Sequence, residues 1–141
     1  MANVSGQRGA KIESLMNQAS DEWNKGNYDM NLTLLERAWD ELPDSKNEYD
    51  ESFLIIWRIL NTSILVGDHA RLRKWVDKIF TADPERRDTG ERDMWAGRVA
   101  YVLGEFVEAK GYFEAADKKS KGRCFSLKDD RKYYNFYKNL E

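Results

Sequence analysis

The stretch LGEFVEAKGYFEAA, residues 103–116, contains the pattern that decides the fold. Its turn is Gly104-Glu105-Phe106, and a stripe of one small, one large and one small residue follows it. The stripe consists of Ala109, Phe113 and Ala116. Spacings of four and three residues would place all three on one face of a helix. The stretch therefore predicts a turn followed by an amphipathic helix.

The same kind of turn, in which glycine is followed by a polar residue and a residue with a ring, occurs three times. The three turns are Gly26-Asn27-Tyr28, Gly67-Asp68-His69 and Gly104-Glu105-Phe106. Their glycines stand 41 and 37 residues apart, so the chain contains an internal repeat. Glycine tolerates the left-handed backbone that ends a helix. The polar residue can cap the next helix, and Asn27 and Asp68 suit this role better than Glu105.

Apolar residues recur at helical spacing on both sides of each turn, which predicts helix pairs. The expected first helices lie at about 11–25, 47–66 and 87–103, and the expected second helices at about 28–41, 70–82 and 106–119. Pro43 and Pro84 both stand seventeen residues beyond the glycine of their repeat, where each would end a helix. The three pairs thus span about 11–42, 47–82 and 87–119.

A further helix is predicted at about 129–140, where aromatic residues recur at helical spacing. It would cap the apolar end of the third pair, as the end of a stack of repeats requires. The connection before it is polar apart from Cys124, Phe125 and Leu127, which could pin it to the stack. We expect residues 1–10 to be a flexible N-terminus and residues 11–141 to form a single domain.

The repeats resemble the tetratricopeptide repeat (TPR), in which a Gly–acid–aromatic turn joins two helices and a small–large–small stripe and a proline follow. The third repeat is the most similar, through Gly97, Gly104, Phe106, Ala109, Phe113 and Ala116. It has Lys121 in place of the proline, and the first repeat has Asn31 at the first small position. Both spacings exceed the family's usual length of about 34 residues. The resemblance implies an all-α fold, an α-solenoid of three TPR-like helix pairs plus a C-terminal capping helix.

In the tetratricopeptide family the first helix of each pair lines a concave face, and the resemblance places three residues of each pair there. These residues are Met16, Ser20, Trp23, Trp57, Asn61, Ile64, Met94, Arg98 and Tyr101. Methionine and aromatic side chains supply adaptable contact area, and Trp, Tyr and Arg are common interface anchors. The resemblance thus implies a groove for a peptide, helix or domain of another protein. The alternative is that Trp57 and Met94 are core residues between adjacent pairs.

The composition is that of a globular helical protein, with 41% apolar and 34% charged residues. A net charge of −2 creates no general positive field, so neither nucleic acid nor a membrane is expected as a partner. The N-terminus lacks the apolar core of a secretion signal, and polar residues interrupt the longest apolar run, 53–66. Cys124 is the only cysteine, which excludes an intrachain disulfide. We therefore expect a cytoplasmic protein.

No constellation in the sequence supports catalysis, so the chain is not expected to be an enzyme. One histidine and one cysteine are too few for a zinc site, and no phosphate-binding or dinucleotide-binding glycine motif occurs. We expect no metal and no cofactor. His69 stands at the aromatic position of its turn, where a packing role is expected. Basic residues near the C-terminus alternate with aromatic ones, but acidic residues stand among them, which favours a solvated helix face.

A protein-binding role is the leading hypothesis, and an immunity-type protein that occludes a bacterial toxin is its specific form. The segment RCFSLKDDRKYYNFYK, residues 123–138, is similar to the endings of small repeat proteins encoded beside polymorphic toxins. A basic toxin domain would favour an acidic partner, because complementary charge speeds association. The alternatives are a secretion chaperone or assembly adaptor that holds a client peptide in the groove, and a scaffold that exchanges its cap between copies. The chain is expected to be a monomer or a homodimer.

Overall fold

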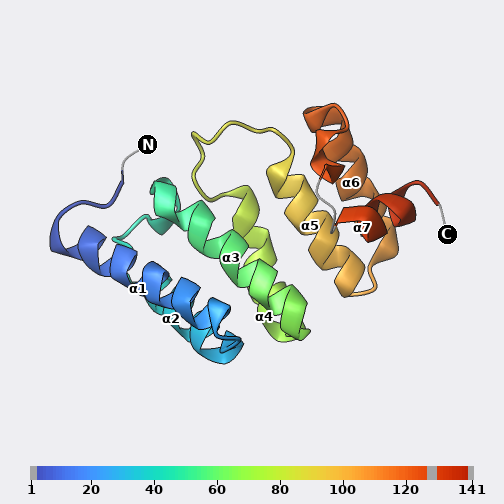
Figure 1. Ribbon diagram of the computed structural model, residues 1–141. Helices are drawn as coiled ribbons and strands as arrows, with labels where there is room; N and C mark the ends of the chain where they lie inside the picture. The colour runs from blue at the N-terminus through green and yellow to red at the C-terminus, as the bar shows by residue number, and fades with distance from the viewer. Residues whose placement is uncertain (1–2, 127–129, 140–141) are drawn as a thin grey trace. The chain divides into compact units, whose positions relative to one another are not determined.

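The computed structural model describes residues 3–126 and 130–139, and within them the regular secondary structure is entirely helical (Figure 1). The prediction of an all-α fold is confirmed at this level. The contacts of the chain divide it into two compact units. Unit 1 extends to Arg86 and unit 2 begins at Arg87, so the boundary falls between the second and third predicted pairs.

Unit 1 contains two helix pairs, in which α1 packs on α2, α2 on α3, and α3 on α4. The bounds are α1 Gly6–Asn24, α2 Tyr28–Glu41, α3 Asp50–Val66 and α4 His69–Trp75, with 3₁₀ turns η1 Lys46–Glu48 and η2 Val76–Phe80. Apolar stripes of these helices form the core of the unit, because burial of such stripes is the main favourable term in folding. Its fully buried side chains include Ile12, Leu32, Leu35, Phe53, Ile56, Ile59, Leu60, Leu72 and Ile79.

The turns within the pairs follow the glycine pattern. Gly26 and Gly67 have φ angles of 80° and 72°, in the left-handed region that glycine adopts without strain. Asp68 caps α4 as expected, because its Oδ1 accepts the backbone N–H of Arg71 at 3.1 Å. Asn27 does not cap α2. Its side-chain amide instead donates to Glu22 Oε2 at 2.7 Å.

A buried polar bridge links three helices of unit 1 at Asn31, the residue at the first small position of the repeat. Asn31 Nδ2 donates to the carbonyl oxygen of Ala19 on α1 at 2.8 Å. Its Oδ1 accepts the hydroxyl of Thr62 on α3, also at 2.8 Å. Both side chains are at least 95% buried, so these bonds form away from water, where an unpaired polar group is costly. The bridge holds α1 and α3 in register against α2.

Charged and aromatic groups connect α2 with α4 on another part of unit 1. Arg71 donates from Nε and Nη2 to the two carboxylate oxygens of Glu36, at 3.3 and 3.1 Å. The indole N–H of Trp75 also donates to Glu36, at 3.3 Å, and the ring meets Trp39 edge-on. The connection that follows η2 returns to the start of the second pair, since the N–H of Asp83 donates to the Asn47 carbonyl at 2.7 Å.

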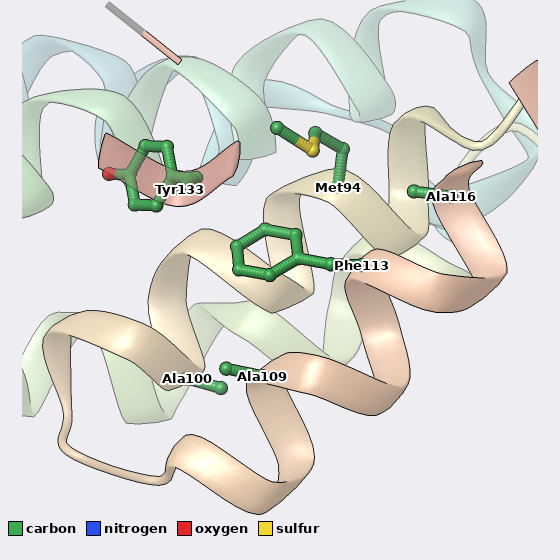
Figure 2. Close-up of a cluster of buried hydrophobic side chains, with 6 residues drawn as sticks. All are labelled: Met94, Ala100, Ala109, Phe113, Ala116 and Tyr133. Carbon is green, nitrogen blue, oxygen red and sulfur yellow. The ribbon is translucent and has the colours of Figure 1, made fainter. Parts of the chain in front are cut away.

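Unit 2 contains one helix pair and the C-terminal helix. Its elements are α5 Glu91–Val102, α6 Phe106–Ser120, the 3₁₀ turn η3 Arg123–Phe125 and α7 Arg131–Tyr137. Gly97 lies against the Phe113 ring, so closely that a Cβ atom there would stand 2.5 Å from Phe113 Cε1. Phe113 is fully buried, with Ala109 and Ala116 on the same face of α6, and Figure 2 shows all three in the core cluster.

The C-terminal helix packs against this core, as predicted. Tyr133 is 5% exposed, and Figure 2 shows its ring on the same side of Phe113 as Met94. Cys124 and Phe125 of the connection pack against the same cluster, which confirms two of the three predicted pinning residues. The third, Leu127, lies outside the described residues.

Three expectations need correction. Residues 6–10, expected to be flexible, belong to α1, and the N–H of Val4 just before them donates to Glu51 on α3 at 3.0 Å. The helix predicted over 70–82 changes to a 3₁₀ turn after Trp75. His69, expected to pack at the aromatic position of its turn, is exposed. Over the described residues, no helix combines the length and apolar character needed to cross a membrane.

Candidate partner-binding surface

The nine residues predicted to face a partner fall on three helices. Six lie in unit 1, three on α1 and three on α3, and the other three lie on α5 in unit 2. Each set belongs to a different compact unit.

On α1, the predicted residues range from buried to exposed. Met16 is only 8% exposed and therefore belongs mainly to the core. Ser20 is exposed, and its hydroxyl donates to the Met16 carbonyl at 3.2 Å. Trp23 is half-buried and meets the ring of Tyr28 edge-on, with the centroids 5.2 Å apart. That contact fixes the orientation of the indole at the end of the helix.

On α3, all three predicted residues, Trp57, Asn61 and Ile64, are half-buried. The guanidinium of Arg58 lies 5.8 Å from the centroid of the Trp57 ring. Burial lowers the pKa of Arg58, because desolvation disfavours the charged form. Arg58 was not among the residues predicted to contact a partner, although its charge stands out within the most apolar helix of the chain.

The Asn31 bridge links the two helices of this surface through α2. It joins the carbonyl of Ala19 and the hydroxyl of Thr62 through one amide group. Ser20 and Asn61 are the direct sequence neighbours of these two residues. The bridge therefore sets the spacing of α1 and α3 at the level of two predicted contact residues.

The three residues on α5 are engaged by other parts of unit 2. Met94 is 4% exposed and belongs to the core cluster. Arg98 forms an ion pair with Asp130 at 2.8 Å, and its guanidinium lies 4.6 Å from the Trp95 ring centroid. Tyr101 contacts three aromatic rings, all edge-on. These are Phe106, Tyr133 and Phe136. The pairing of Arg98 with Asp130 was not predictable from the sequence, because it depends on how the chain folds back after α6.

Charge is distributed unequally between the units. Residues up to Arg86 include 15 Asp or Glu and 11 Lys or Arg, whereas the rest of the chain has 10 acidic and 12 basic residues. The late basic residues that the structure describes are exposed, as expected for a solvated face; these are Lys118, Lys119, Lys121, Arg123, Arg131, Lys132 and Lys138. Lys119 is also paired with Asp93 and Asp88, at 2.8 and 2.9 Å. The acidic excess therefore belongs to unit 1.

No three His, Cys, Asp or Glu side chains of residues 3–126 and 130–139 lie together in a way that could hold a metal ion. Cys124 is half-buried, and burial raises the pKa of its thiol.

Neither a protein-family model, a curated protein nor a solved structure matches the chain. The assignment of this surface to partner binding therefore depends only on the geometry of the residues described above.

Proposed function

We propose that this chain is a non-catalytic protein-binding module, built as an α-solenoid of three TPR-like pairs with a C-terminal cap. In such a module the first helices of the pairs form the inner face and contact the partner. Unit 1 would supply the principal contact area through α1 and α3. The proposal needs no cofactor, because shape, apolar area and charge would provide the affinity.

One observation carries the proposal. Half-buried Trp23, Trp57 and Ile64 lie on the two helices that the Asn31 bridge holds in register. Large aromatic side chains that are ordered but still partly accessible are the usual anchors of protein interfaces. Asn61 and Ser20, on the same two helices, offer hydrogen-bonding groups.

The specific form of the proposal is an immunity-type protein that binds and neutralises a bacterial toxin. The acidic excess of unit 1 supports it, because an acidic surface would attract a basic toxin domain and speed the encounter. Neutralisation then requires only that the bound module covers the toxin's working surface.

The test begins with crosslinking and affinity capture of the tagged chain in its native host, followed by mass spectrometry. The expected partner is a folded, basic domain that harms cells when it is expressed alone and is tolerated when the chain is co-expressed. Capture of an unfolded or newly made segment would favour a chaperone or adaptor instead. Recovery of only the chain itself would favour the scaffold hypothesis.

The contact surface is tested with the Trp23→Ala/Trp57→Ala variant. We expect its affinity for the captured partner to fall at least about 100-fold, since two interface anchors of about 2 kcal/mol or more are lost. Trp39→Ala is a matched control, because Trp39 is also half-buried but contacts Trp75 on the α2–α4 side. Equal losses in both variants, or none in either, would reject the α1–α3 surface.

A further inference from the structure

The predicted contact residues of unit 2 are covered by the chain's own C-terminal segment, residues 130–139. Asp130 pairs with Arg98, while Tyr133 and Phe136 lie against Tyr101. Met94, the third residue of this set, belongs to the same buried cluster as Tyr133 (Figure 2). The segment thus occupies the surface of α5 that the resemblance to the tetratricopeptide repeat assigns to a partner.

The covering side chains form one face of a helix. Tyr133, Phe136 and Tyr137 follow Asp130 at three, six and seven positions, which all lie within one side of a helical turn. Their rings also meet Phe113 of the core, with centroid separations of 5.7, 6.2 and 6.5 Å. Tyr134 points elsewhere, being 39% exposed and in contact with Phe125. The segment therefore presents an acidic group and three rings to the rest of unit 2.

Among the described residues, only one oxygen of the Asp130 carboxylate has a hydrogen-bond partner. The Asp130 side chain is only 4% exposed, and Arg98 engages its Oδ1. The other oxygen, Oδ2, is buried and accepts no hydrogen bond from the part of the chain that the structure describes. A buried ion pair is favourable only when its remaining polar atoms are also satisfied. A carboxylate that places both oxygens on donors would therefore compete well for Arg98.

The segment is also short and attached mainly through its rings. Helix α7 has seven residues, of which only Tyr133 is buried, and helices of this length are not stable by themselves. Its other polar anchors are Tyr137, which donates to Asp117 at 3.0 Å, and Asn139, which accepts from half-buried Lys110. Elements with few buried contacts open locally at a lower free energy than the core.

We propose that residues 130–139 hold the place of a partner helix on unit 2, and that a partner displaces them with an acidic–aromatic helix of the same pattern. That helix would carry an Asp or Glu followed by aromatic residues three, six and seven positions later. Arg98 would receive its carboxylate, and Tyr101 and Phe113 its rings. The inference rests on the proposed protein-binding function and specifies the partner's chemistry for unit 2.

The test uses the full chain and a fluorescein-labelled designed peptide that carries this pattern on a helix of Ala and Gln. The Tyr133→Ala/Phe136→Ala variant removes the two rings on Tyr101 and should release the segment. We expect it to bind the peptide at least about tenfold more tightly than wild type, because apparent affinity falls with the fraction of molecules whose site is open. Lys132→Ala/Lys138→Ala changes exposed residues of the same segment and should bind like wild type.

Two further arms test the chemistry of the site. Adding Arg98→Met to the released variant should weaken peptide binding about tenfold, through loss of the carboxylate's partner. A scrambled peptide of the same composition should bind neither protein. The inference is overturned if wild type and the released variant bind equally, if the released variant does not bind, or if the scrambled peptide binds as well.

If circular dichroism shows that the released variant has lost helix, hydrogen exchange of the wild-type chain tests the displacement of the segment instead. The amides of α7 should exchange at least about tenfold faster than those of α6, as a locally opening segment does. Exchange of both helices at one common rate would mean that the segment opens only on global unfolding, and would reject displacement. A captured partner whose binding depends on Trp57 but is unchanged by release of the segment would contradict this inference alone.

Discussion

At Gly97, the approach of α5 to α6 depends on the absence of a side chain. A Cβ atom would stand 2.5 and 2.6 Å from two carbons of the Phe113 ring. Phe113 is fully buried and touches four other aromatic rings, so it has little space into which to move. The small residue at this position and the large one on α6 are thus a matched pair.

We expect Gly97→Ala to lower the free energy of unfolding by about 1–3 kcal/mol, because overpacking a core forces side chains off their preferred rotamers. Urea unfolding followed by circular dichroism measures the change. Gly111→Ala is the matched control, since Gly111 is also helical and a Cβ atom there meets nothing within 4 Å. The control should be stabilising by up to about 1 kcal/mol, because alanine is the better helix former. Equal effects of the two substitutions would contradict the packing argument.

The cap residue Asp68 makes part of the stability pH-dependent. The backbone N–H of Arg71, and then its guanidinium, hold the pKa of Asp68 below its ordinary value of 3.8. A carboxyl group whose pKa is lowered by folding stabilises the protein above its unfolded-state pKa. That contribution is lost as the pH falls through the folded-state pKa.

Asp68→Asn keeps a capping oxygen but removes the charge. At pH 7 we expect it to lower the free energy of unfolding by at most about 1 kcal/mol, since the group is near the surface and screened. The difference from wild type should stay nearly constant from pH 7 to about 4.5 and shrink as the pH falls below about 4, towards the lowered pKa of Asp68. Urea midpoints measured at each pH provide the comparison, and a difference that stays constant down to pH 3 would show that the charge is not involved.

Among the elements, α1, α2 and α3 are joined by a polar contact where the repeat pattern has a small apolar residue. Asn31 supplies both a donor and an acceptor, and Thr62 depends on it for its buried hydroxyl. Removing one partner leaves the other unpaired away from water. Removing both leaves only an apolar contact of similar volume, which is nearly neutral in other proteins.

Asn31→Leu and Thr62→Val should therefore each destabilise the chain by about 1–3 kcal/mol, and the double variant by clearly less than their sum. Thermal or urea unfolding of the four proteins gives the coupling free energy. Thr33→Val is the control, because Thr33 is exposed and bonds only within its own helix, so a change of about 0.5 kcal/mol or less is expected. If the changes in unfolding free energy of the two single variants add up to that of the double variant, Asn31 and Thr62 are not coupled and the argument for the bridge is wrong.

The helix pairs were predictable because their signals are local. Left-handed glycines end the first helices, and the apolar stripes of the second helices keep their spacing. What escaped prediction depends on contacts between distant residues. The bond of Val4 to Glu51 is one such contact, beside a first turn of α1 that carries no apolar periodicity. Asn27 had a better partner in Glu22 than the helix it was expected to cap.

For the whole molecule, the division at Arg86 and Arg87 is the feature that the repeat pattern concealed, because all three turns look equivalent in sequence. The resemblance to the tetratricopeptide repeat treats the nine residues of the candidate surface as equivalent, whereas in the structure their exposure and neighbours differ between the units. Ser20 is exposed and Trp57 half-buried, whereas Arg98 and Tyr101 lie under the C-terminal segment. That difference follows from where a seven-residue helix docks, which no periodicity encodes.

The hydrogen bond from Asp83 to Asn47 has a consequence for how such a chain can lengthen. It ties the exit of the second pair back to its own entrance, at 2.7 Å, three residues before the unit ends. The second helix pair is therefore already closed by this hydrogen bond before the residues of unit 2 begin. A change in the number of repeats after this junction would therefore leave the closing bond itself in place, since both of its residues belong to unit 1.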